Sequence, residues 1–337
     1  MFKRRDFLKT SAVIAAVGGL QACRRETPGW AADAHRKPDL SPVGILPAET
    51  YDEVQLHDTV LRGIRLFGLD VQGLRVVLKP NLVEFDPSGV INTHPTLIAA
   101  TIEAFRSLGA REVIVAEGPG HRRDNEYLLK ASGLQEHMRE MEARFVDLNH
   151  DDARRVSLRS TFTVLGELYL PVTVLDADLF VSMPKLKTHH WAGVTLSMKN
   201  LFGIVPGALY GWPKNLLHWV GLQGSIVDIN AALDVPRFNI VDGIVGMEGN
   251  GPIQGEAKQV GVVVMGSDTV AVDATCARLM NIDPWKIGYL ASVEPFLGNL
   301  ALERIEQRGA GLSTHQADFR VLEAFAHTKA SRSMSGG

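Results

Sequence analysis

The 337-residue chain contains very little cysteine. Its two cysteines are Cys23, within an N-terminal segment that we interpret as an export signal, and Cys276. The one thiol left after removal of such a signal can form no internal disulfide. It cannot hold an iron–sulfur cluster alone, because these clusters need several thiolates. Cys276 lies in the apolar stretch AVDATCARLM, which is typical of a core residue. We therefore expect no iron–sulfur cluster ligated by the chain's own cysteines.

A basic excess and the common nucleotide motifs are also absent. The chain has 35 lysine and arginine residues against 38 aspartate and glutamate residues, a formal net charge of −3. This balance argues against a general nucleic-acid-binding surface, so any anion site must be local. No GxGxxG, GxxxxGK[ST] or GxSxG sequence occurs. Dinucleotide-binding, P-loop and serine hydrolase interpretations are therefore disfavoured.

The first 23 residues have the pattern of an export signal. A basic start precedes an apolar core from Ala12 to Leu20, which is too short to span a bilayer as a mature anchor. RRDFLK at residues 4–9 matches the twin-arginine signal. LQAC at residues 20–23 resembles a lipoprotein box and predicts lipidation of Cys23, whereas residues 32–34 are the alternative cleavage site. We expect the twin-arginine machinery to export the protein to the periplasm or cell envelope, with membrane contact only through a lipid anchor.

Helix and strand patterns alternate in the rest of the chain. We expect residues 24–50 to be a proline-rich tether, residues 51–325 to form a single α/β domain, and residues 326–337 to fray. The alternation predicts a largely parallel sheet with helices on both faces. Residues 161–175, which follow the charged residues 150–159, are interpreted as a strand pair and hence a small antiparallel insertion. The expected helices lie around residues 52–67, 95–108, 125–138, 216–233 and 270–280, and the expected strands around 74–78, 112–116, 178–183, 237–244 and 259–266.

Lysines and amides recur just after the predicted strands. In open parallel sheets, ligands bind beyond the carboxyl ends of the strands. There, lysine tips and backbone N–H groups of glycine- or proline-rich loops suit a phosphate or carboxylate. Two ammonium groups on one face of the KLK strand would repel each other unless an anion or a carboxylate lay between them. Snorkelling at the strand rim is the other interpretation of Lys79. The predicted ligand-binding residues are Lys79, Asn81, Lys185, Lys187, Lys199 and Asn200.

Acids and histidines in the same regions are the predicted catalytic residues. Glu117, Asp242 and Glu248 are candidates for a general base or for ligands of a divalent metal such as Mg²⁺. His189 is an acid/base candidate. Because His189 and His190 are adjacent, only one is expected to face a site, and their spacing is weak for a metal. The aromatic residues 210–222 are a lid over the site, a docking surface or a packed helix.

These motifs together resemble a known family. VVLKPNLV, HPTLI, VAEGPG, KLKTHHWAGVTLSMKNLFG and DGIVGMEGNGPIQG, within about residues 74–287, resemble the family called domain of unknown function 362. Some of its members carry ferredoxin-type cysteine clusters, which this chain lacks. The resemblance implies no reaction, but it implies that the predicted ligand-binding and catalytic residues occupy the family's motif positions.

Two classes of function follow as expectations. In the first, an exported α/β enzyme binds an anionic small molecule or cofactor, bearing phosphate or carboxylate, in a pocket of lysines and acids, with or without a divalent metal. In the second, a non-catalytic accessory protein hands a cofactor or metal to an exported redox partner. The sequence leaves open whether the protein is an enzyme.

Overall fold

A computed structural model describes residues 37–120 and 124–330. The predicted twin-arginine signal, the lipidation of Cys23, the first part of the tether and residues 331–337 lie outside these ranges. Those interpretations stay predictions. Within the described ranges, no helix is both long and apolar enough to cross a membrane.

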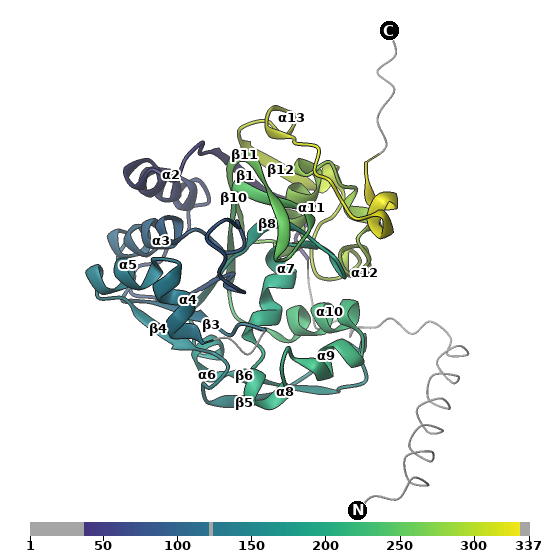
Figure 1. Cartoon of the computed structure of the whole chain (residues 1–337), viewed down its shortest axis with the longest axis horizontal. Helices are drawn as coiled ribbons and strands as arrows, with labels where there is room; N and C mark the ends of the chain where they lie inside the picture. Colours follow the sequence, from purple (N-terminus) through teal and green to yellow (C-terminus); the bar gives the residue numbers. More distant parts are fainter. Residues whose placement is uncertain (1–36, 121–123, 331–337) are drawn as a thin grey trace, which may run out of the picture.

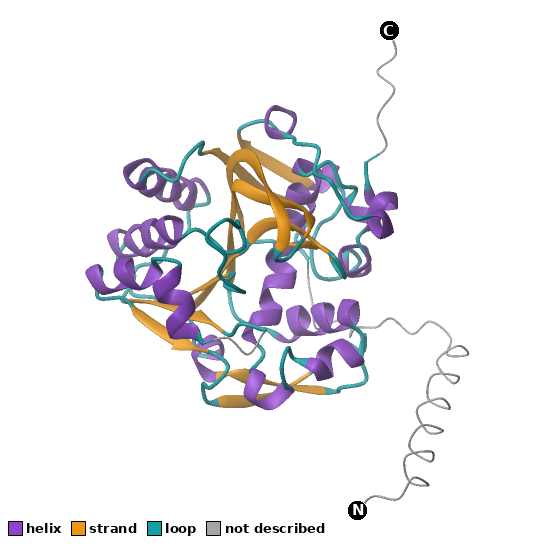
Figure 2. Cartoon of the chain, viewed as in Figure 1, coloured by secondary structure: helices purple, strands orange, loops and turns teal. Residues whose placement is uncertain are grey.

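A mixed sheet of ten strands organises the fold (Figures 1 and 2). Its order is β12-β1-β11-β10-β7-β2-β3-β4, and β8 pairs with β10 and β9. β2 runs parallel to β3 and β7, and β10 runs parallel to β7 and β8. β11 is antiparallel to β1 and β10, and β5 and β6 form a separate antiparallel pair. The predicted α/β fold with a largely parallel sheet and a small antiparallel insertion is confirmed.

The elements have the following bounds. The strands are β1 Ser41–Pro47, β2 Arg75–Pro80, β3 Glu112–Glu117, β4 Arg144–Asp147, β5 Ala153–Ser157, β6 Glu167–Pro171, β7 Leu179–Met183, β8 Lys185–His189, β9 Gly193–Thr195, β10 Arg237–Asn250, β11 Gln254–Gly266 and β12 Ile305–Gly309. The α-helices are α2 Glu53–Leu66, α3 Pro95–Ser107, α4 Asn125–Ala131, α5 Leu134–Glu140, α6 Val172–Leu175, α7 Ser197–Asn200, α8 Gly207–Tyr210, α9 Asn215–Trp219, α10 Leu222–Ala232, α11 Thr269–Leu279, α12 Gly288–Val293 and α13 Leu312–His315. The 3-10 helices are η2 Leu201–Ile204, η3 Pro284–Lys286, η4 Leu302–Arg304 and η5 Glu323–Thr328.

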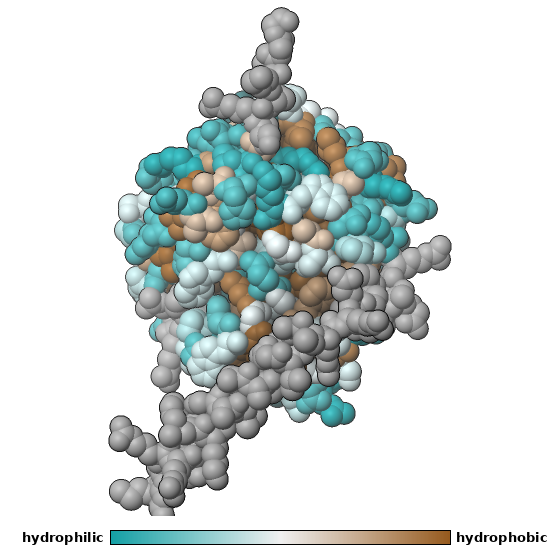
Figure 3. Space-filling view, turned by 90° about the vertical axis from the view of Figure 1, so that its right-hand side faces the viewer, coloured by the Kyte–Doolittle hydropathy of each residue, from teal (hydrophilic) through white to brown (hydrophobic). Residues whose placement is uncertain are grey.

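Helices cover both faces of the sheet, which therefore has two apolar cores. Figure 1 shows α2, α3 and α5 on one side and α11 and α12 on the other. Successive residues of a strand point to opposite faces, so Val76 and Leu78 lie in the first core and Val77 lies in the second. Cys276 is buried in the second core, as its apolar surroundings predict. Figure 3 shows hydrophobic side chains in small groups between hydrophilic ones on one face of the molecule.

Two expectations about the elements are wrong. Ser41–Pro47, within the predicted tether, is strand β1 and lies between β11 and β12, so the fold begins before Tyr51. The strand pair of the insertion also lies elsewhere, because the charged Ala153–Ser157 is paired with Glu167–Pro171, and Val172–Leu175 is helix α6. Backbone hydrogen bonds to a neighbouring strand override the proline signals in β1 and the charge of β5.

The strand order changes direction beside β2. From β2 the chain proceeds to β3 and β4 on one side, whereas the later strands β7 and β10 lie on the other side. In open parallel sheets, ligands bind beyond the carboxyl ends of the strands at such a change of direction.

Candidate functional site

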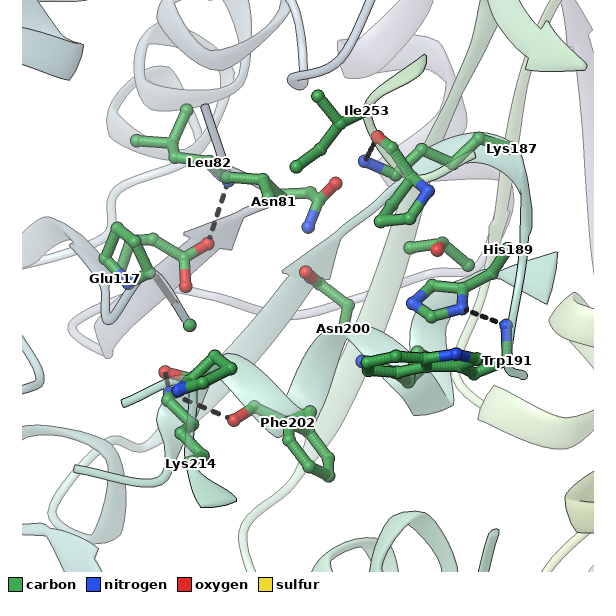
Figure 4. A pocket seen from close by; sticks show the side chains of 18 of the residues that line it. Asn81, Leu82, Glu117, Lys187, His189, Trp191, Asn200, Phe202, Lys214 and Ile253 are labelled. Atoms are coloured by element: carbon green, nitrogen blue, oxygen red, sulfur yellow. Dashed lines mark hydrogen bonds between the residues drawn. The ribbon is translucent and has the colours of Figure 1, made fainter. Parts of the chain in front are cut away.

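A cavity of about 390 Å³ lies beyond the carboxyl ends of β2 and β3 (Figure 4). Elements far apart in the sequence line it: the ends of β2 and β3, strand β8, helix α7 and the loop before α9. Seven of the ten predicted catalytic and ligand-binding residues line it: Lys79, Asn81, Glu117, Lys187, His189, Lys199 and Asn200.

Lys79 and Glu117 form a buried ion pair at the base of the cavity. The Nζ atom of Lys79 lies 2.7 Å from Oε2 of Glu117, and neither side chain is more than 2% exposed. Lys79 also donates to Oδ1 of Asn200 and to a backbone carbonyl. The carboxylate of Glu117 accepts from the backbone N–H groups of residues 82 and 118. The ion pair thus holds Glu117 against Lys79 with three accepted hydrogen bonds, and its role as a general base or metal ligand stays a prediction.

A glycine makes this packing possible. A Cβ atom built on Gly203 would lie 2.6 Å from Nζ of Lys79, closer than real Cβ contacts. Only glycine lets the backbone of η2 approach the ion pair so closely. The NLFG motif therefore has a packing role at the cavity.

Lys187 and Lys214 are two further buried cations of the cavity. Lys187 donates to the carbonyl oxygens of Ile91, at 2.8 Å, and Pro252, at 3.2 Å. Lys214 donates to three carbonyl oxygens, among them that of Phe202 at 3.1 Å (Figure 4). Burial lowers the pKa of both lysines, whereas their carbonyl acceptors favour the ammonium form.

Lys199 differs from the other lysines of the cavity. Its Nζ atom lies 4.3 Å from the centre of the Phe202 ring, and within the described residues it makes no hydrogen bond or ion pair. Burial and the positive charge of Lys79 lower its pKa to about 8, against the opposing effect of Glu117. Its ammonium group is therefore available to a ligand.

The ring of His189 points into the cavity (Figure 4). Its Nδ1 atom accepts from the backbone N–H groups of Trp191, at 3.0 Å, and Ala192, at 3.1 Å. The proton of the neutral ring must then lie on Nε2. Burial and the neighbouring Lys199 lower the pKa of His189 far below its usual value. The neutral ring therefore offers an Nε2–H donor to a ligand.

Two polar atoms at the cavity have no partner in the described part of the chain. They are Oδ1 of Asn81 and Oγ1 of Thr195, and both are buried. Buried polar atoms in folded proteins are normally hydrogen-bonded. A bound ligand or water would satisfy both.

Comparison with known proteins places this arrangement in a family. The model of a family described as Domain of unknown function (DUF362) matches residues 76–278, more than half of the chain. The chain belongs to this family. The resemblance drawn from its motifs is thereby confirmed, and the family description specifies no reaction.

The DUF362 chain is also similar to several individual proteins. A thylakoid-associated protein of Synechocystis sp. is 28% identical over 270 residues, which are 75% of this chain and 78% of that protein. The lactate racemase apoprotein from Thermoanaerobacterium thermosaccharolyticum aligns with a TM-score of 0.43 and 16% identity, over 74% of this chain and 58% of that one. A protein from Thermotoga maritima aligns with a TM-score of 0.38 and 13% identity, over 68% of this chain and 59% of that one. The chain thus spans less than two thirds of either solved structure.

Three predicted residues of the DUF362 chain lie outside the cavity. Lys185 and Asp242 form a second buried ion pair, 2.9 Å apart, and the hydroxyl group of Tyr51 contacts both. Asp242 also accepts from the backbone N–H of His94. Glu248 binds Arg320, with 2.8 Å between Oε1 and Nε, and so holds the C-terminal segment. An anion or a carboxylate was expected between Lys185 and Lys187. For Lys185, the counter-charge is the carboxylate of Asp242.

The predicted acids do not gather into a metal site. Each has its own cation: Lys79 for Glu117, Lys185 for Asp242 and Arg320 for Glu248. Among the described residues, no three His, Cys, Asp or Glu side chains are arranged to hold a metal ion. The donors that face this cavity suit an anion better than a divalent cation.

Helix α7 of the DUF362 domain is held by Asp273 from α11. Its carboxylate accepts from the backbone N–H groups of Ser197, at 2.7 Å, and Met198, at 2.9 Å. Burial raises the pKa of Asp273 to about 7. This contact fixes the turn that carries Lys199 and Asn200, so Asp273 is a positioning residue. Asp268, by contrast, caps α11, where its side chain accepts from the backbone N–H groups of Val270 and Ala271.

The aromatic residues 210–222 contribute to the cavity wall. Pro213, Lys214 and His218 line the cavity, and Leu217 is buried in the core. Trp219 is 79% exposed. Lys214 was missed by the sequence analysis because no motif marks it: its ammonium group is placed by a positive φ of 66° at the turn before α9.

Proposed function

We propose that the cavity binds a small anionic molecule bearing phosphate or carboxylate. The observation that carries this proposal is the imbalance of charge in its lining. Four lysines, Lys79, Lys187, Lys199 and Lys214, face one carboxylate, Glu117, which is already bound to Lys79. In a site of low dielectric constant, unbalanced cations of this kind attract an anion strongly.

The donors at the cavity divide into two groups. Lys79 and Lys214 each donate to three protein acceptors, so they act on a ligand through their charge. Lys199, the Nε2–H of His189 and the Nδ2 amino group of Asn81 are donors that make no hydrogen bond to the described residues. The unpartnered Oδ1 of Asn81 is an acceptor and would need a donor group of the ligand or a water. We infer that these three groups contact the anion directly.

The size and the walls of the cavity suit a metabolite-sized ligand. Pockets for small molecules have volumes of about 300–1,000 Å³, and this one has about 390 Å³. Phe202, Trp191 and Ile253 supply apolar surface to the lining of the cavity. We infer a ligand with one anionic group and a small apolar or planar body.

The test is stabilisation of the purified mature protein by phosphate. Ligand binding raises the unfolding free energy by about 2.7 kcal/mol at a hundredfold excess over the dissociation constant. We expect phosphate, compared with chloride at matched ionic strength, to raise the Tm. Lys199→Met should remove most of this rise, whereas Lys130→Met, at an exposed position on α4, should retain it. Equal rises in both variants would refute the proposal.

We also propose that the protein acts in the periplasm or cell envelope after twin-arginine export. This proposal is supported by the sequence of residues 1–23. Cell fractionation of the full chain, compared with an Arg4→Lys/Arg5→Lys variant, tests it. Retention of both forms in the same soluble cytoplasmic fraction would contradict it.

A non-catalytic accessory role is the second candidate. Trp219 and Leu216 on α9 are exposed beside the cavity wall, and exposed aromatic residues are frequent in protein interfaces. In this role the protein would hand its bound cofactor or metal to an exported redox partner. Mass spectrometry and elemental analysis of the protein purified from its native source distinguish the two roles. A bound metabolite favours the enzyme, and a co-purified oxidoreductase favours the accessory.

A further inference from the structure

Lys199 has the surroundings of a reactive amine. The other three lysines of the cavity donate hydrogen bonds to protein oxygen atoms, as described above. Lys199 faces the cavity with no oxygen acceptor among the described residues, and its Nζ atom lies over the ring of Phe202. Its ammonium group therefore lacks the hydrogen bonds that stabilise the charge of its neighbours.

The groups around Lys199 are mostly cationic. Lys79 from β2, Lys187 from β8 and Lys214 from the turn before α9 interact with it, while Glu117 from β3 opposes them. The ring of His189, from β8, is neutral and adds no charge. An amine that is desolvated and placed beside other cations loses its proton more easily and becomes a nucleophile.

We propose that Lys199 forms an imine with the carbonyl carbon of a small 2-oxo acid bound in the cavity. This proposal rests on the proposed anion-binding function and narrows its ligand class. The carboxylate of the 2-oxo acid would lie against the Nε2–H of His189 and the amide of Asn81. Its carbonyl carbon, one bond away, would then face the amine of Lys199.

The chemistry balances without any further reactant. The neutral amine of Lys199 adds to the carbonyl carbon: a C–N bond forms, the C=O double bond becomes a single bond, and one proton passes from the nitrogen to the oxygen. The C–O single bond then breaks, the hydroxyl group leaves as water with the second proton of the nitrogen, and a C=N bond remains. Hydrolysis reverses each step. An imine of this kind withdraws electrons from the adjacent C–H bond, which suits proton abstraction or C–C bond chemistry at that carbon.

The fraction of free amine supports reaction at Lys199 over a surface lysine. Within the cavity the distinction is geometric, because burial lowers the pKa of Lys214 further, to about 7, but Lys214 donates to three carbonyl oxygens. Burial and Lys79 lower the pKa of Lys199 to about 8, whereas an ordinary lysine has a pKa near ~10.4. At neutral pH, Lys199 therefore holds on the order of a hundredfold more free amine than a surface lysine. Reaction at Lys199 should rise with pH and level off above about 8.

The experiment traps the imine by reduction. The mature protein is incubated at neutral pH with pyruvate, or with phenylpyruvate as a probe with an apolar body, and treated with borohydride. Peptide mass spectrometry then compares adducts at Lys199 and at the surface residue Lys130. We expect Lys199 to be the dominant site, to saturate with pyruvate and to be protected by phosphate. Lys199→Arg, which keeps the positive charge but has no primary amine, should lose the adduct.

The outcomes separate the two proposals. If phosphate and pyruvate both stabilise the protein but Lys199 gains no more adduct than Lys130, the imine proposal is refuted and the anion pocket stands. If neither anion stabilises the wild-type protein and no adduct forms at Lys199, both proposals fail. Peptide mapping uses the wild-type chain, so the conclusion does not depend on the folding of any variant.

Discussion

Removal of the Glu117 carboxylate is the sharpest perturbation of this cavity. Glu117→Gln keeps the shape of the side chain and leaves the ammonium group of Lys79 buried without its counter-charge. In the wild-type chain, Nζ of Lys79 lies 2.7 Å from Oε2 of Glu117, and the two side chains are 0% and 2% exposed. Breaking a buried pair by neutralising one partner costs about 3–5 kcal/mol. The amide also presents an N–H group to a backbone N–H or to Lys79, which cannot accept it.

A surface pair provides the matched control. Glu167 and Arg155 join β5 to β6 at 3.4 Å, with side chains 44% and 65% exposed. Exposed pairs contribute only about 0.2–1 kcal/mol, so Glu167→Gln should have little effect. The change from Glu to Gln is thus expected to lower the unfolding free energy several-fold more at Glu117 than at Glu167, because the first ion pair is buried and the second is exposed.

Urea unfolding followed by tryptophan fluorescence and circular dichroism measures both variants. A Lys79→Met/Glu117→Gln double variant should recover part of the loss, because it no longer buries an unpaired charge. The reasoning is refuted if Glu117→Gln lowers the unfolding free energy no more than Glu167→Gln. It is also refuted if the double variant loses as much unfolding free energy as Lys79→Met and Glu117→Gln lose in sum.

Three further predictions concern the same cavity. Gly203→Ala should lower the unfolding free energy in urea by about 1–3 kcal/mol because its Cβ meets Lys79. Gly120→Ala, whose Cβ would have no atom of the described residues within 4 Å, should lower it little. Burial raises the pKa of Asp273 to about 7. The folded state then holds a proton that the unfolded state releases, so stability should fall as pH rises from about 4 to 7, and Asp273→Asn should flatten this fall in urea titrations. The affinity for sulfate, whose charge is constant here, should fall as pH rises through about 8, where Lys199 loses its proton; Lys199→Arg should remove this dependence in calorimetry.

Several residues that line the cavity were predictable because they lie at the carboxyl ends of parallel strands. Lys79 is the next-to-last residue of β2, Asn81 directly follows this strand, and Glu117 is the last residue of β3. Because β2 and β3 are parallel neighbours, their carboxyl ends meet at one edge of the sheet. Short apolar runs followed by polar residues carry this information in the sequence itself. The roles assigned to these residues as ligand contacts stay predictions.

Other residues could not be placed from the sequence, because their partners are distant along the chain. Lys185 lies opposite Asp242 in the parallel β8–β10 ladder, a register that depends on the path of the whole sheet. Strand periodicity puts Lys185 and Lys187 on the same side, but it does not say that a carboxylate fills the space beside one of them. No sequence pattern marks Lys214, which lies directly before α9 with a positive φ of 66°.

The number of lysines in a motif is a poor guide to which of them meets a ligand. A buried ammonium group has three N–H bonds, and each bond that meets a protein oxygen is lost to a ligand. Lys79 and Lys214 use all three bonds within the protein. They set the potential of the cavity and hold its loops together, at positions that a ligand need not touch. Lys199 makes no hydrogen bond to the described residues and lies beside the other lysines, so the proposed anion binding and the proposed imine formation both depend on this residue.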